Sequence, residues 1–456
     1  MASPTKTIII PIFDGTITKN ILRTSVWKRL RSVPGLRIVI IPPKGKDELY
    51  IKEFGGDGVF FESSTLWQEG AWGTFFQGMF LHSIPTNFMR IRQVDWFWHT
   101  GKYVNYFGAS ILRFLGKFSL WRNLLMFLGA FEPIAPEVRD MYARWKPDVV
   151  FAPTTIPSLE VSLMRLARKD GKKIVGMMKS WDNLTSKAFP RIFSDYLIVP
   201  NEISIEEATK FYDFPKERIV VTGIPQYDDY IHPDFLEPRE EFFKNLGLDP
   251  NKKTILYTPA GDWMNPNDKD ILASLLDAIK EGRIKNIQVL LRLHPAYESK
   301  AEELHGDPSM VVERPGKHFG GLKTYEFFDA DVRHLASSIA YSDIVIHTAS
   351  TMAIEGAIYD KPVISLAYDG KYKLDYWHST RRYYDREHCV PIIRSLGTAL
   401  VKSEEEFLSA VETYFTYPET HKEGRKKIVD WECYKMDGKA TERIADVLFR
   451  ALWVLS

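Results

Sequence analysis

The sequence contains little cysteine, with only Cys389 and Cys433 among its 456 residues. Two cysteines cannot form the disulfide framework of a secreted protein, and neither lies in a Cys-x-x-Cys or Cys/His cluster that would bind zinc. The sequence also lacks an uninterrupted apolar run of the roughly 20 residues that span a membrane. The apolar stretch 8–12 is too short for a signal peptide. We therefore expect a cytoplasmic protein without a metal site.

Two common nucleotide-binding signatures are absent as well. The sequence contains neither the glycine-rich Walker loop of P-loop kinases nor the Gly-x-Gly-x-x-Gly turn of dehydrogenases, which disfavours both classes. The net charge of +1 disfavours a general nucleic-acid binder. That charge is unevenly distributed, because residues 1–135 carry 16 lysines and arginines against 9 aspartates and glutamates. We expect an anionic partner to meet this N-terminal third.

Short runs rich in isoleucine and valine recur between longer segments of helical period, which is typical of parallel βαβ units. The sequence predicts strands at Thr7–Ile12, Arg37–Ile41, Gly58–Phe61, Asp148–Ala152, Lys173–Met177, Tyr196–Val199, Arg218–Thr222, Thr254–Thr258, Ile287–Leu291, Met310–Val312, Asp343–His347 and Pro362–Leu366. The length exceeds what one hydrophobic core usually covers. We predict an α/β fold of two Rossmann-like, doubly wound parallel-sheet domains facing a cleft.

A segment rich in proline and aspartate near residues 224–250 predicts a linker between these domains. We place the first domain at 1–224, with a basic aromatic insertion near 64–131, and the second at 225–436. The remaining residues, 437–456, have an apolar side chain every four positions and predict a helix, which we expect to pack back on the first domain. Ligands of doubly wound sheets bind beyond the carboxyl ends of the strands, so the loops that follow strands are the candidate sites.

The strongest candidate follows the predicted strand that ends at His347. Thr348, Ser350 and Thr351 precede a helix of small residues, and a helix N-terminus attracts phosphate through its unpaired N–H groups and its dipole. Glu355, about one turn further on, could accept hydrogen bonds from ribose hydroxyls. The pattern predicts a site for the donor diphosphate. A plain serine or threonine cap on a core helix remains the alternative.

A second candidate follows the strand Ile287–Leu291. Alternation places Arg292 and His294 on one face at the strand's end, where an arginine fork suits a phosphate oxygen and a histidine could move a proton. The alternative is a salt bridge for Arg292 and a packing role for His294. Gly261, after the strand Thr254–Thr258, permits close approach of the backbone to a ligand.

The first domain offers two further clusters behind predicted strands. Trp181, Asp182 and Asn183 follow the strand Lys173–Met177 and present polar groups that could contact an acceptor. Asp14 follows the first strand and is our candidate for the general base that activates an acceptor hydroxyl. A polar turn for the first cluster and a helix-capping role for Asp14 are the alternatives.

The stretch 96–131 contains no aspartate or glutamate but many aromatic side chains, together with Arg113, Lys117 and Arg122. Basic helices rich in tryptophan and phenylalanine, such as the one carrying Trp121, lie in the membrane interface and are attracted by anionic lipid. The sequence predicts such a peripheral membrane contact. An aromatic core helix with cations pointing to solvent is the alternative.

These loops together resemble a known family. The resemblance to the second domain of GT-B transferases rests on the segments Ile255–Pro259, Leu291–Pro295, Asp343–Ile346 and Lys361–Ile364. Val221–Asp228 resembles the segment that leads from the first domain of such enzymes to the second. Surface-polysaccharide glycosyltransferases and CDP-glycerol glycerophosphotransferases are the most similar members.

The resemblance implies that the donor nucleotide binds the second domain and the acceptor binds the first. It makes Arg292, His294, Ser350, Thr351 and Glu355 donor contacts. Where glycerophosphotransferases tend to carry a Thr-Asp-Tyr-Ser-Ser segment, this chain has His-Thr-Ala-Ser-Thr from residue 347. That departure favours a nucleotide-sugar donor over a glycerol-phosphate donor.

We therefore expect a glycosyltransferase that moves a sugar from a nucleotide-sugar co-substrate to a polysaccharide or lipid-linked acceptor, with no bound cofactor and no nucleic-acid partner. The alternatives within the same fold are a glycerol- or polyol-phosphate transferase with a CDP-linked donor and a UDP-sugar 2-epimerase. A non-catalytic membrane- or sugar-binding protein is the alternative of another class. The aromatic stretch adds the expectation of a peripheral contact with the inner face of the cell membrane.

Overall fold

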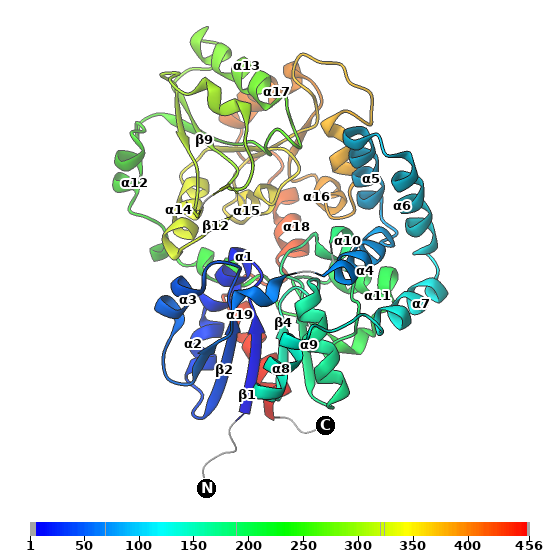
Figure 1. Cartoon of the computed structure of the whole chain (residues 1–456). Coiled ribbons are helices and arrows are strands. Elements are labelled where there is room, and N and C mark those ends of the chain that lie inside the picture. Colours follow the sequence, from blue (N-terminus) through cyan, green and yellow to red (C-terminus); the bar gives the residue numbers. More distant parts are fainter. Residues whose placement is uncertain (1–5, 69, 188, 320, 323, 454–456) are drawn as a thin grey trace. The chain divides into compact units, whose positions relative to one another are not determined.

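The computed structural model describes residues 6–68, 70–187, 189–319, 321–322 and 324–453 (Figure 1). The chain forms two compact units. Unit 1 comprises Met1–Asp228 and Tyr434–Ser456, and unit 2 comprises Asp229–Cys433. The chain thus passes from unit 1 to unit 2 four residues beyond the predicted end of the first domain, and it returns three residues before the predicted end of the second.

The sheet of unit 1 has seven parallel strands in the order β3-β2-β1-β4-β5-β6-β7. The strands are β1 (Lys6–Pro11), β2 (Leu36–Ile41), β3 (Val59–Phe61), β4 (Val149–Ala152), β5 (Lys173–Met177), β6 (Tyr196–Val199) and β7 (Ile219–Val221). Most of their isoleucine and valine side chains are fully buried, which parallel strands covered on both faces require. Each strand coincides with a predicted one to within about a residue.

The helical elements of unit 1 cover this sheet and form the insertion between β3 and β4. They are α1 (Gly15–Ile17), the π-helix η1 (Thr18–Leu22), α2 (Ser25–Arg31), α3 (Asp47–Phe54), η2 (Ser64–Trp67), α4 (Ala71–His82), α5 (Asn87–Thr100), α6 (Tyr103–Leu115), α7 (Ser119–Gly129), α8 (Pro136–Trp145), α9 (Ser158–Lys169), α10 (Asn183–Ser186), α11 (Ile203–Tyr212), η3 (Lys216–Arg218) and α19 (Ala440–Trp453). The short helix η4 (Pro225–Ile231) carries the chain out of unit 1.

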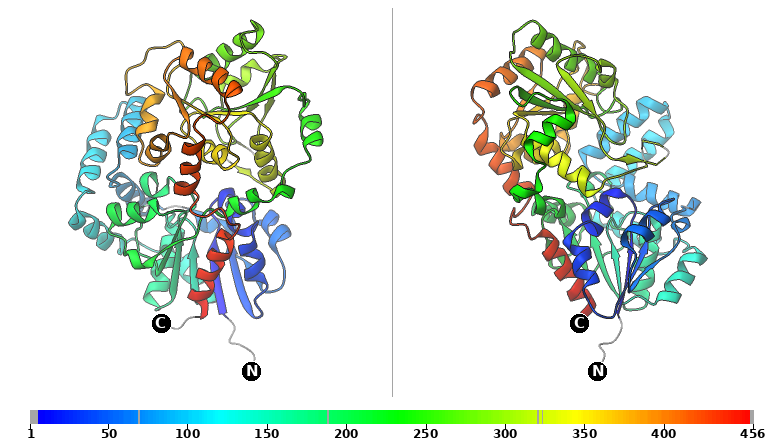
Figure 2. Two further views of the ribbon diagram at one scale, coloured as in Figure 1. Left: turned by 180° about the vertical axis from the view of Figure 1, so that it is seen from behind. Right: turned by 90° about the vertical axis from the view of Figure 1, so that its left-hand side faces the viewer.

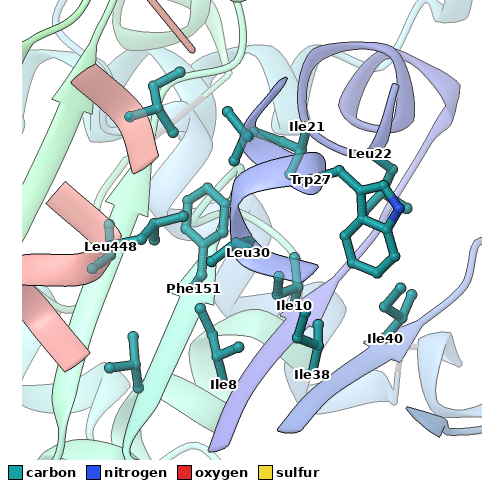
Figure 3. Close-up of a cluster of buried hydrophobic side chains, with 14 of the residues drawn as sticks. Ile8, Ile10, Ile21, Leu22, Trp27, Leu30, Ile38, Ile40, Phe151 and Leu448 are labelled. Carbon is teal, nitrogen blue, oxygen red and sulfur yellow. The ribbon is translucent and has the colours of Figure 1, made fainter. Parts of the chain in front are cut away.

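The core of unit 1 lies between its strands and two helices that are distant in sequence. Figure 3 shows Ile8 and Ile38 of the strands gathered with Leu30 of α2 and Leu448 of α19. In Figure 2, α19 (red) lies against the strands of unit 1. The C-terminal helix therefore packs on unit 1.

The start of α19 is fixed by a residue far away in the sequence. The carboxylate of Asp228 accepts hydrogen bonds from the backbone N–H groups of Ala440 and Thr441, at 2.9 and 2.8 Å. Such acceptors satisfy N–H groups that a helix leaves unpaired at its first turn. This cap joins Asp228, the last residue before the chain enters unit 2, to α19, which follows the return of the chain to unit 1. The spacing of the two segments in the sequence could not predict this pairing.

The sheet of unit 2 has six parallel strands in the order β10-β9-β8-β13-β14-β15. Its strands are β8 (Lys253–Thr258), β9 (Ile287–Arg292), β10 (Met310–Glu313), β13 (Ile344–His347), β14 (Val363–Leu366) and β15 (Ala399–Val401), and a hairpin adds β11 (Lys317–His318) and β12 (Tyr325–Glu326). The sequence predicted the first five of the sheet strands. Three-residue β15 and the two-residue hairpin strands are too short for a recognisable pattern.

The helical elements of unit 2 are η5 (Pro233–Phe235), α12 (Arg239–Leu246), α13 (Asp268–Lys280), η6 (Lys300–Leu304), α14 (Asp329–Ala340), α15 (Met352–Ile358), η7 (Thr380–Asp385), α16 (Val390–Ser395), α17 (Glu404–Thr416) and α18 (Lys422–Glu432). No helix in the described part of the chain is both long and apolar enough to cross a membrane.

Candidate active site

In unit 2 the loops after β8, β9, β13 and β14 leave the same edge of the sheet, because these strands are parallel neighbours. Two hydrogen bonds tie the loops together. The Thr258 hydroxyl donates to the Ile346 carbonyl at 2.8 Å, and the Asn265 side-chain amide donates to the Thr348 hydroxyl at 3.2 Å. The predicted residue Thr348 is therefore buried and holds the loops in place.

The loop after β13 is organised by a buried histidine. Nδ1 of His347 accepts a hydrogen bond from the backbone N–H of Ser350 at 3.1 Å, and the Ser365 hydroxyl lies 3.0 Å from Nε2. Burial lowers the pKa of His347 to about 3, so the ring is neutral. The Ser350 hydroxyl accepts from the N–H of Met352 at 3.3 Å. Ser350 thus bonds to the first residue of α15, whose N-cap, Thr351, makes no capping hydrogen bond with its side chain. The phosphate site predicted at this turn stays a prediction.

Glu355 lies inside unit 2 with 5% of its surface exposed. Its carboxylate accepts hydrogen bonds from the hydroxyls of Tyr230, at 2.8 Å, and Thr351, at 3.3 Å. The helix that carries it, α15, has only seven residues. Glu355 and Thr351 are therefore bound to each other, and the nucleotide contacts predicted for them stay predictions.

Arg292, which we predicted to contact the donor phosphate, is the last residue of β9. It is buried, and its guanidinium pairs with the carboxylate of Glu313, its register neighbour on β10. His334 donates to the same carboxylate at 2.7 Å and contacts Glu237 at 2.9 Å through its other ring nitrogen. The strand-end arginine therefore forms the salt bridge named as the alternative, because a parallel neighbour presents a carboxylate directly beside it.

One ring nitrogen of His294 is bound within its own loop. Its Nδ1 accepts a hydrogen bond from the backbone N–H of Ala296 at 3.0 Å. Burial, with a smaller contribution from Arg314, lowers the pKa of His294 to about 4, so the ring is neutral and carries its proton on Nε2. A ring in this tautomer donates a hydrogen bond without adding charge. Such a ring can bind a phosphoryl oxygen, and the proton-transfer role predicted for His294 stays a prediction.

Gly261 adopts a positive φ of 86°, and a side chain there would collide with the Cβ of Tyr297 at 2.6 Å. The close approach that the glycine permits is therefore to Tyr297. The same loop is anchored by Asp268, which accepts from Tyr257, Ala260 and Asn265 at distances of 2.9–3.1 Å. Burial raises the pKa of Asp268 to about 7.

In unit 1 the edge at the carboxyl ends of β1, β4 and β5 carries a second group of charged residues. Asp14 caps α1, accepting from the N–H groups of Thr16 and Ile17 at 3.0 and 3.2 Å, and it also pairs with Lys179. Asp14 thus has the capping role that we gave as its alternative. Its further role as a base stays a prediction, with Lys179 as an ion partner that the sequence did not indicate.

Fully buried Glu160 holds the loop after β4. Its carboxylate accepts from the backbone N–H groups of Thr154 and Thr155 at 3.0 and 2.6 Å, and burial raises its pKa to about 7. The backbone of Thr155 has a positive φ of 58°. A glutamate in the first turn of α9 is a common pattern, so only the fold identifies this one as the organiser of a loop.

The predicted acceptor residues lie close behind this edge. Trp181 is largely buried, and Asp182 forms an ion pair with Lys187 at 2.8 Å. Asn183 is fully buried, and neither side-chain atom has a hydrogen-bond partner among the described residues. Both polar side-chain atoms of Asn183 are therefore unmatched among the described residues.

The four residues predicted to meet a membrane separate into two groups. Arg122 is buried and pairs with Asp213 at 2.6 Å, while its Nη1 donates to the Gly116 carbonyl at 2.8 Å. This excludes it from the lipid contact that we predicted, because its charge is used to join α6, α7 and α11. Trp121 is half-buried and Arg113 donates to Gln93 at 3.1 Å, whereas Lys117 is exposed.

No cluster of metal-ligating side chains occurs among the residues that the structure describes. The important residues that the sequence did not single out are His347, Asp268 and Glu160. Lys179 opens the polar cluster 179–187 behind the predicted strand Lys173–Met177, but its pairing with Asp14 was not predicted. Lys179 had a usable signal, because it stands two positions after β5, at the edge where ligands of such sheets bind.

Comparison with known proteins gives a family match over more than half of the chain. Residues 183–450 match the family described as CDP-glycerol:poly(glycerophosphate) glycerophosphotransferase. The chain is 25% identical, over 264 residues, to the teichoic acid poly(glycerol phosphate) polymerase of Bacillus spizizenii, covering 56% of this chain and 59% of that protein. It is 22% identical, over 295 residues, to the teichoic acid ribitol-phosphate polymerase TarL of Staphylococcus aureus, covering 63% and 45%. The chain therefore spans less than two thirds of these relatives.

Solved structures with the same fold include an S. aureus MnaA–UDP complex, with a TM-score of 0.55, 13% identity and coverage of 99% of this chain and 98% of that one. The wall teichoic acid polymerase TagF matches with a TM-score of 0.51, 13% identity and coverage of 99% and 90%. At such low identity these likenesses show the fold alone. Together with the two parallel sheets they identify it as GT-B, as the sequence predicted.

Proposed function

This chain belongs to the CDP-glycerol:poly(glycerophosphate) glycerophosphotransferase family, and on that premise we propose that it transfers glycerol phosphate or ribitol phosphate from a CDP-linked donor to a hydroxyl of a cell-surface polymer. The observation that carries the proposal is the family match, which includes the whole of unit 2. The similarity to glycerol- and ribitol-phosphate polymerases supports it further.

The proposal replaces the nucleotide-sugar donor that we expected from the sequence with the CDP-linked polyol-phosphate donor, the first of the alternatives named there. That expectation rested on five residues from His347 to Thr351. In the structure these residues stabilise the loop after β13, because Ser350 donates a hydrogen bond to His347 and Thr348 accepts one from Asn265. Their departure from the family's usual segment therefore says little about the donor.

The proposed reaction forms one phosphoester bond and breaks one anhydride bond. The oxygen of the acceptor hydroxyl attacks the phosphorus that bears the polyol, CMP leaves with the bridging oxygen, and the hydroxyl proton passes to a base. His294 donates its Nε2 proton in a hydrogen bond to a phosphoryl oxygen, which stabilises the charge of the transition state. Asp14 remains the candidate base.

The test is a panel of CDP-glycerol, CDP-ribitol and UDP-N-acetylglucosamine, measured by thermal unfolding of the full chain. A donor at 100 times its Kd should stabilise the protein by about 2.7 kcal/mol. We expect a CDP-polyol to do so and to release CMP when a glycerol-phosphate primer is added. Stabilisation by UDP-N-acetylglucosamine alone would contradict the proposal, and its conversion to the 2-epimer would identify the epimerase alternative.

A variant pair tests the role of His294. His294→Ala should slow CMP release by about 10²-fold, as the loss of one donor to a developing oxyanion does. His305→Ala removes an exposed histidine of the same unit and serves as the matched control. Equal rates for the two variants would remove His294 from the reaction.

We also propose that unit 1 rests on an anionic membrane surface, which would bring a lipid-linked acceptor to the enzyme. The support is an uncovered apolar face on α6 and α7. This α6–α7 apolar face consists of Val104, Phe107, Ile111, Phe114, Leu120, Leu124 and Phe127, each at least 44% exposed. An apolar patch of this kind marks an interaction site. Exposed Lys102 and Lys117 lie in the same acid-free stretch and suit anionic lipid.

Co-sedimentation with vesicles tests this contact. The double variant Lys102→Glu, Lys117→Glu should bind vesicles containing anionic lipid more weakly, since each cation near the surface contributes about 1 kcal/mol. Lys169→Glu, Lys216→Glu makes the same charge change at exposed positions elsewhere in unit 1 and should bind normally. Wild-type protein that stays in the supernatant at low and high salt would contradict the membrane contact.

A further inference from the structure

Unit 1 contains a cavity of about 340 Å³ at the carboxyl edge of its sheet. Three of its lining residues each stand two positions beyond a strand. Phe13 follows β1, Thr154 follows β4 and Lys179 follows β5, and these three strands are adjacent in the sheet. The position is the one where doubly wound sheets bind ligands. The side chain of Phe13 is about half exposed, so the cavity reaches the surface.

The polar part of the cavity wall favours an anion. Four cationic side chains line it, those of Arg92, Lys179, Lys187 and Arg191, and none of the described residues in its wall carries a carboxylate. The carboxylates that pair with three of them, Asp14, Asp182 and Glu132, are not part of the wall. A ligand in the cavity therefore meets donors without facing acids, as a phosphate requires.

The other part of the wall is apolar and largely aromatic. Phe80 and Phe189 meet edge to face with their ring centres 5.0 Å apart, and Phe13 meets Trp67 in the same way at 5.4 Å. Leu81 lies beside them on α4. Aromatic walls next to a few charged donors are typical of sites for small molecules with an apolar portion. A free inorganic anion would leave this wall without a partner.

Helix α4 connects the cavity to the outer surface. It contributes Phe80 and Leu81 to the cavity wall, while Trp72 and Phe75 on the same helix are 61% and 54% exposed. A chain that leaves the cavity along α4 would thus continue over apolar side chains. The cavity has room for a phosphate and the first part of such a chain, because its volume lies at the lower end of the range for ligand pockets.

We propose that this cavity binds the acceptor through a phosphate ester that carries an apolar chain, with the phosphate at Lys179 and Lys187 and the chain against the rings of Phe80 and Phe189. This inference rests on the proposed function, since it assigns the acceptor site of the same reaction. Asp14 adjoins this site, because it neighbours Phe13 and pairs with Lys179.

Isothermal titration of the full chain with three probes tests the chemistry of the ligand. Decyl glycerophosphate below its micelle concentration carries charge and chain, glycerol phosphate carries only the charge, and decyl maltoside carries only the chain. We expect decyl glycerophosphate to bind at least tenfold more tightly than either of the others. Equal affinity for glycerol phosphate would show a plain phosphate site, and equal affinity for decyl maltoside would show an apolar site. Either result overturns the proposal.

Two variants place the binding in this cavity. Gln77→Trp fills it from α4, and Thr74→Trp adds the same ring at an exposed position of the same helix. Lys187→Ala removes a cation from the wall, and Lys172→Ala removes an ion-paired lysine that precedes β5 at the opposite edge of the sheet. We expect affinity for decyl glycerophosphate to fall at least tenfold in the first member of each pair only. Unchanged affinity in both cavity variants would overturn the assignment.

Donor binding separates the failure of this inference from failure of the proposed function. Gln77→Trp should keep the stabilisation by a CDP-polyol, because the residues that we predict to bind the donor lie in unit 2. If no CDP-polyol stabilises the wild-type protein while decyl glycerophosphate still binds, the proposed function fails and the cavity keeps its ligand class. If a CDP-polyol stabilises both proteins while decyl glycerophosphate binds neither, the cavity assignment alone fails.

Discussion

Helix α19 and the helices α6 and α7 have the same periodic pattern of apolar side chains but opposite surroundings. In α19, Ile444 and Leu448 are fully buried in the core of unit 1. In α6, Phe107 and Phe114 are more than half exposed, and the only fully buried residue of that helix in the described chain is Ala109. Figure 1 shows α6 on the outer side of α5. Periodicity thus predicts that a helix has an apolar face and does not predict what covers it.

The composition of the two helices does distinguish them. α19 has acidic and basic residues on the face opposite its apolar stripe, including Glu442 and Asp446, the second of which pairs with Arg29. The stretch from residue 96 to 131 lacks acids entirely, and exposed Lys117 lies over the ring of Phe114. A surface with cations only is suited to an anionic partner. Because the helices share the same apolar period, only their difference in charge indicates that protein covers the apolar face of α19 and that an anionic partner suits the apolar face of α6 and α7.

The largest change in folding stability should come from the apolar face of α19, which the core of unit 1 covers. Leu448→Ala removes a fully buried side chain between α2 and the strands, and such truncations destabilise proteins by about 2–5 kcal/mol. Chemical or thermal unfolding of the full chain would measure this loss. A loss below about 1 kcal/mol would mean that α19 is not an integral part of the core of unit 1.

The next effect concerns Arg122, whose sequence neighbours suggested a lipid contact. Arg122→Ala removes the guanidinium donor from the Gly116 carbonyl and from the Asp213 carboxylate, which we expect to cost about 1–3 kcal/mol. Lys117→Ala, at an exposed position five residues earlier, should change stability by less than about 0.5 kcal/mol. Similar unfolding midpoints for the two variants would contradict a structural role for Arg122.

A smaller change in stability should come from the ion pairs of His334 in unit 2, and it should depend on pH. Burial alone would lower the pKa of His334, but hydrogen bonds and attraction from Glu313 and Glu237 raise it above 6.5, although Arg292 opposes them. A raised folded-state pKa contributes stability that is fully present below the unfolded value and is lost as pH rises through the folded value. Wild-type protein should therefore lose stability relative to His334→Gln as the pH rises through the raised pKa of His334, above its ordinary value. Parallel pH profiles would contradict this ion network.

The sequence predicted the strands well because buried parallel strands consist of short runs of isoleucine and valine, and few other elements of a fold have this pattern. It located the strand ends for the same reason, so the loops with Asp14, Thr348 and His294 were identified. It could not assign their partners. The pairing of Arg292 with Glu313 depends on which strands are neighbours, and the cap that Asp228 gives to α19 joins residues more than 200 positions apart.

The smallest change in stability should come from the α6–α7 apolar face, and this prediction separates the two kinds of helix most sharply. Phe107→Ser, Phe114→Ser and Phe127→Ser together remove three aromatic rings that are 61%, 56% and 62% exposed. Little surface is taken from water at these positions on folding, so each substitution should alter the free energy of unfolding by no more than about 0.5 kcal/mol. Binding to anionic vesicles should nevertheless fall steeply, because the rings that enter the interface are gone. A large loss of stability would mean that the face is covered by protein. Unchanged stability together with unchanged vesicle binding would mean that lipid is not what covers it.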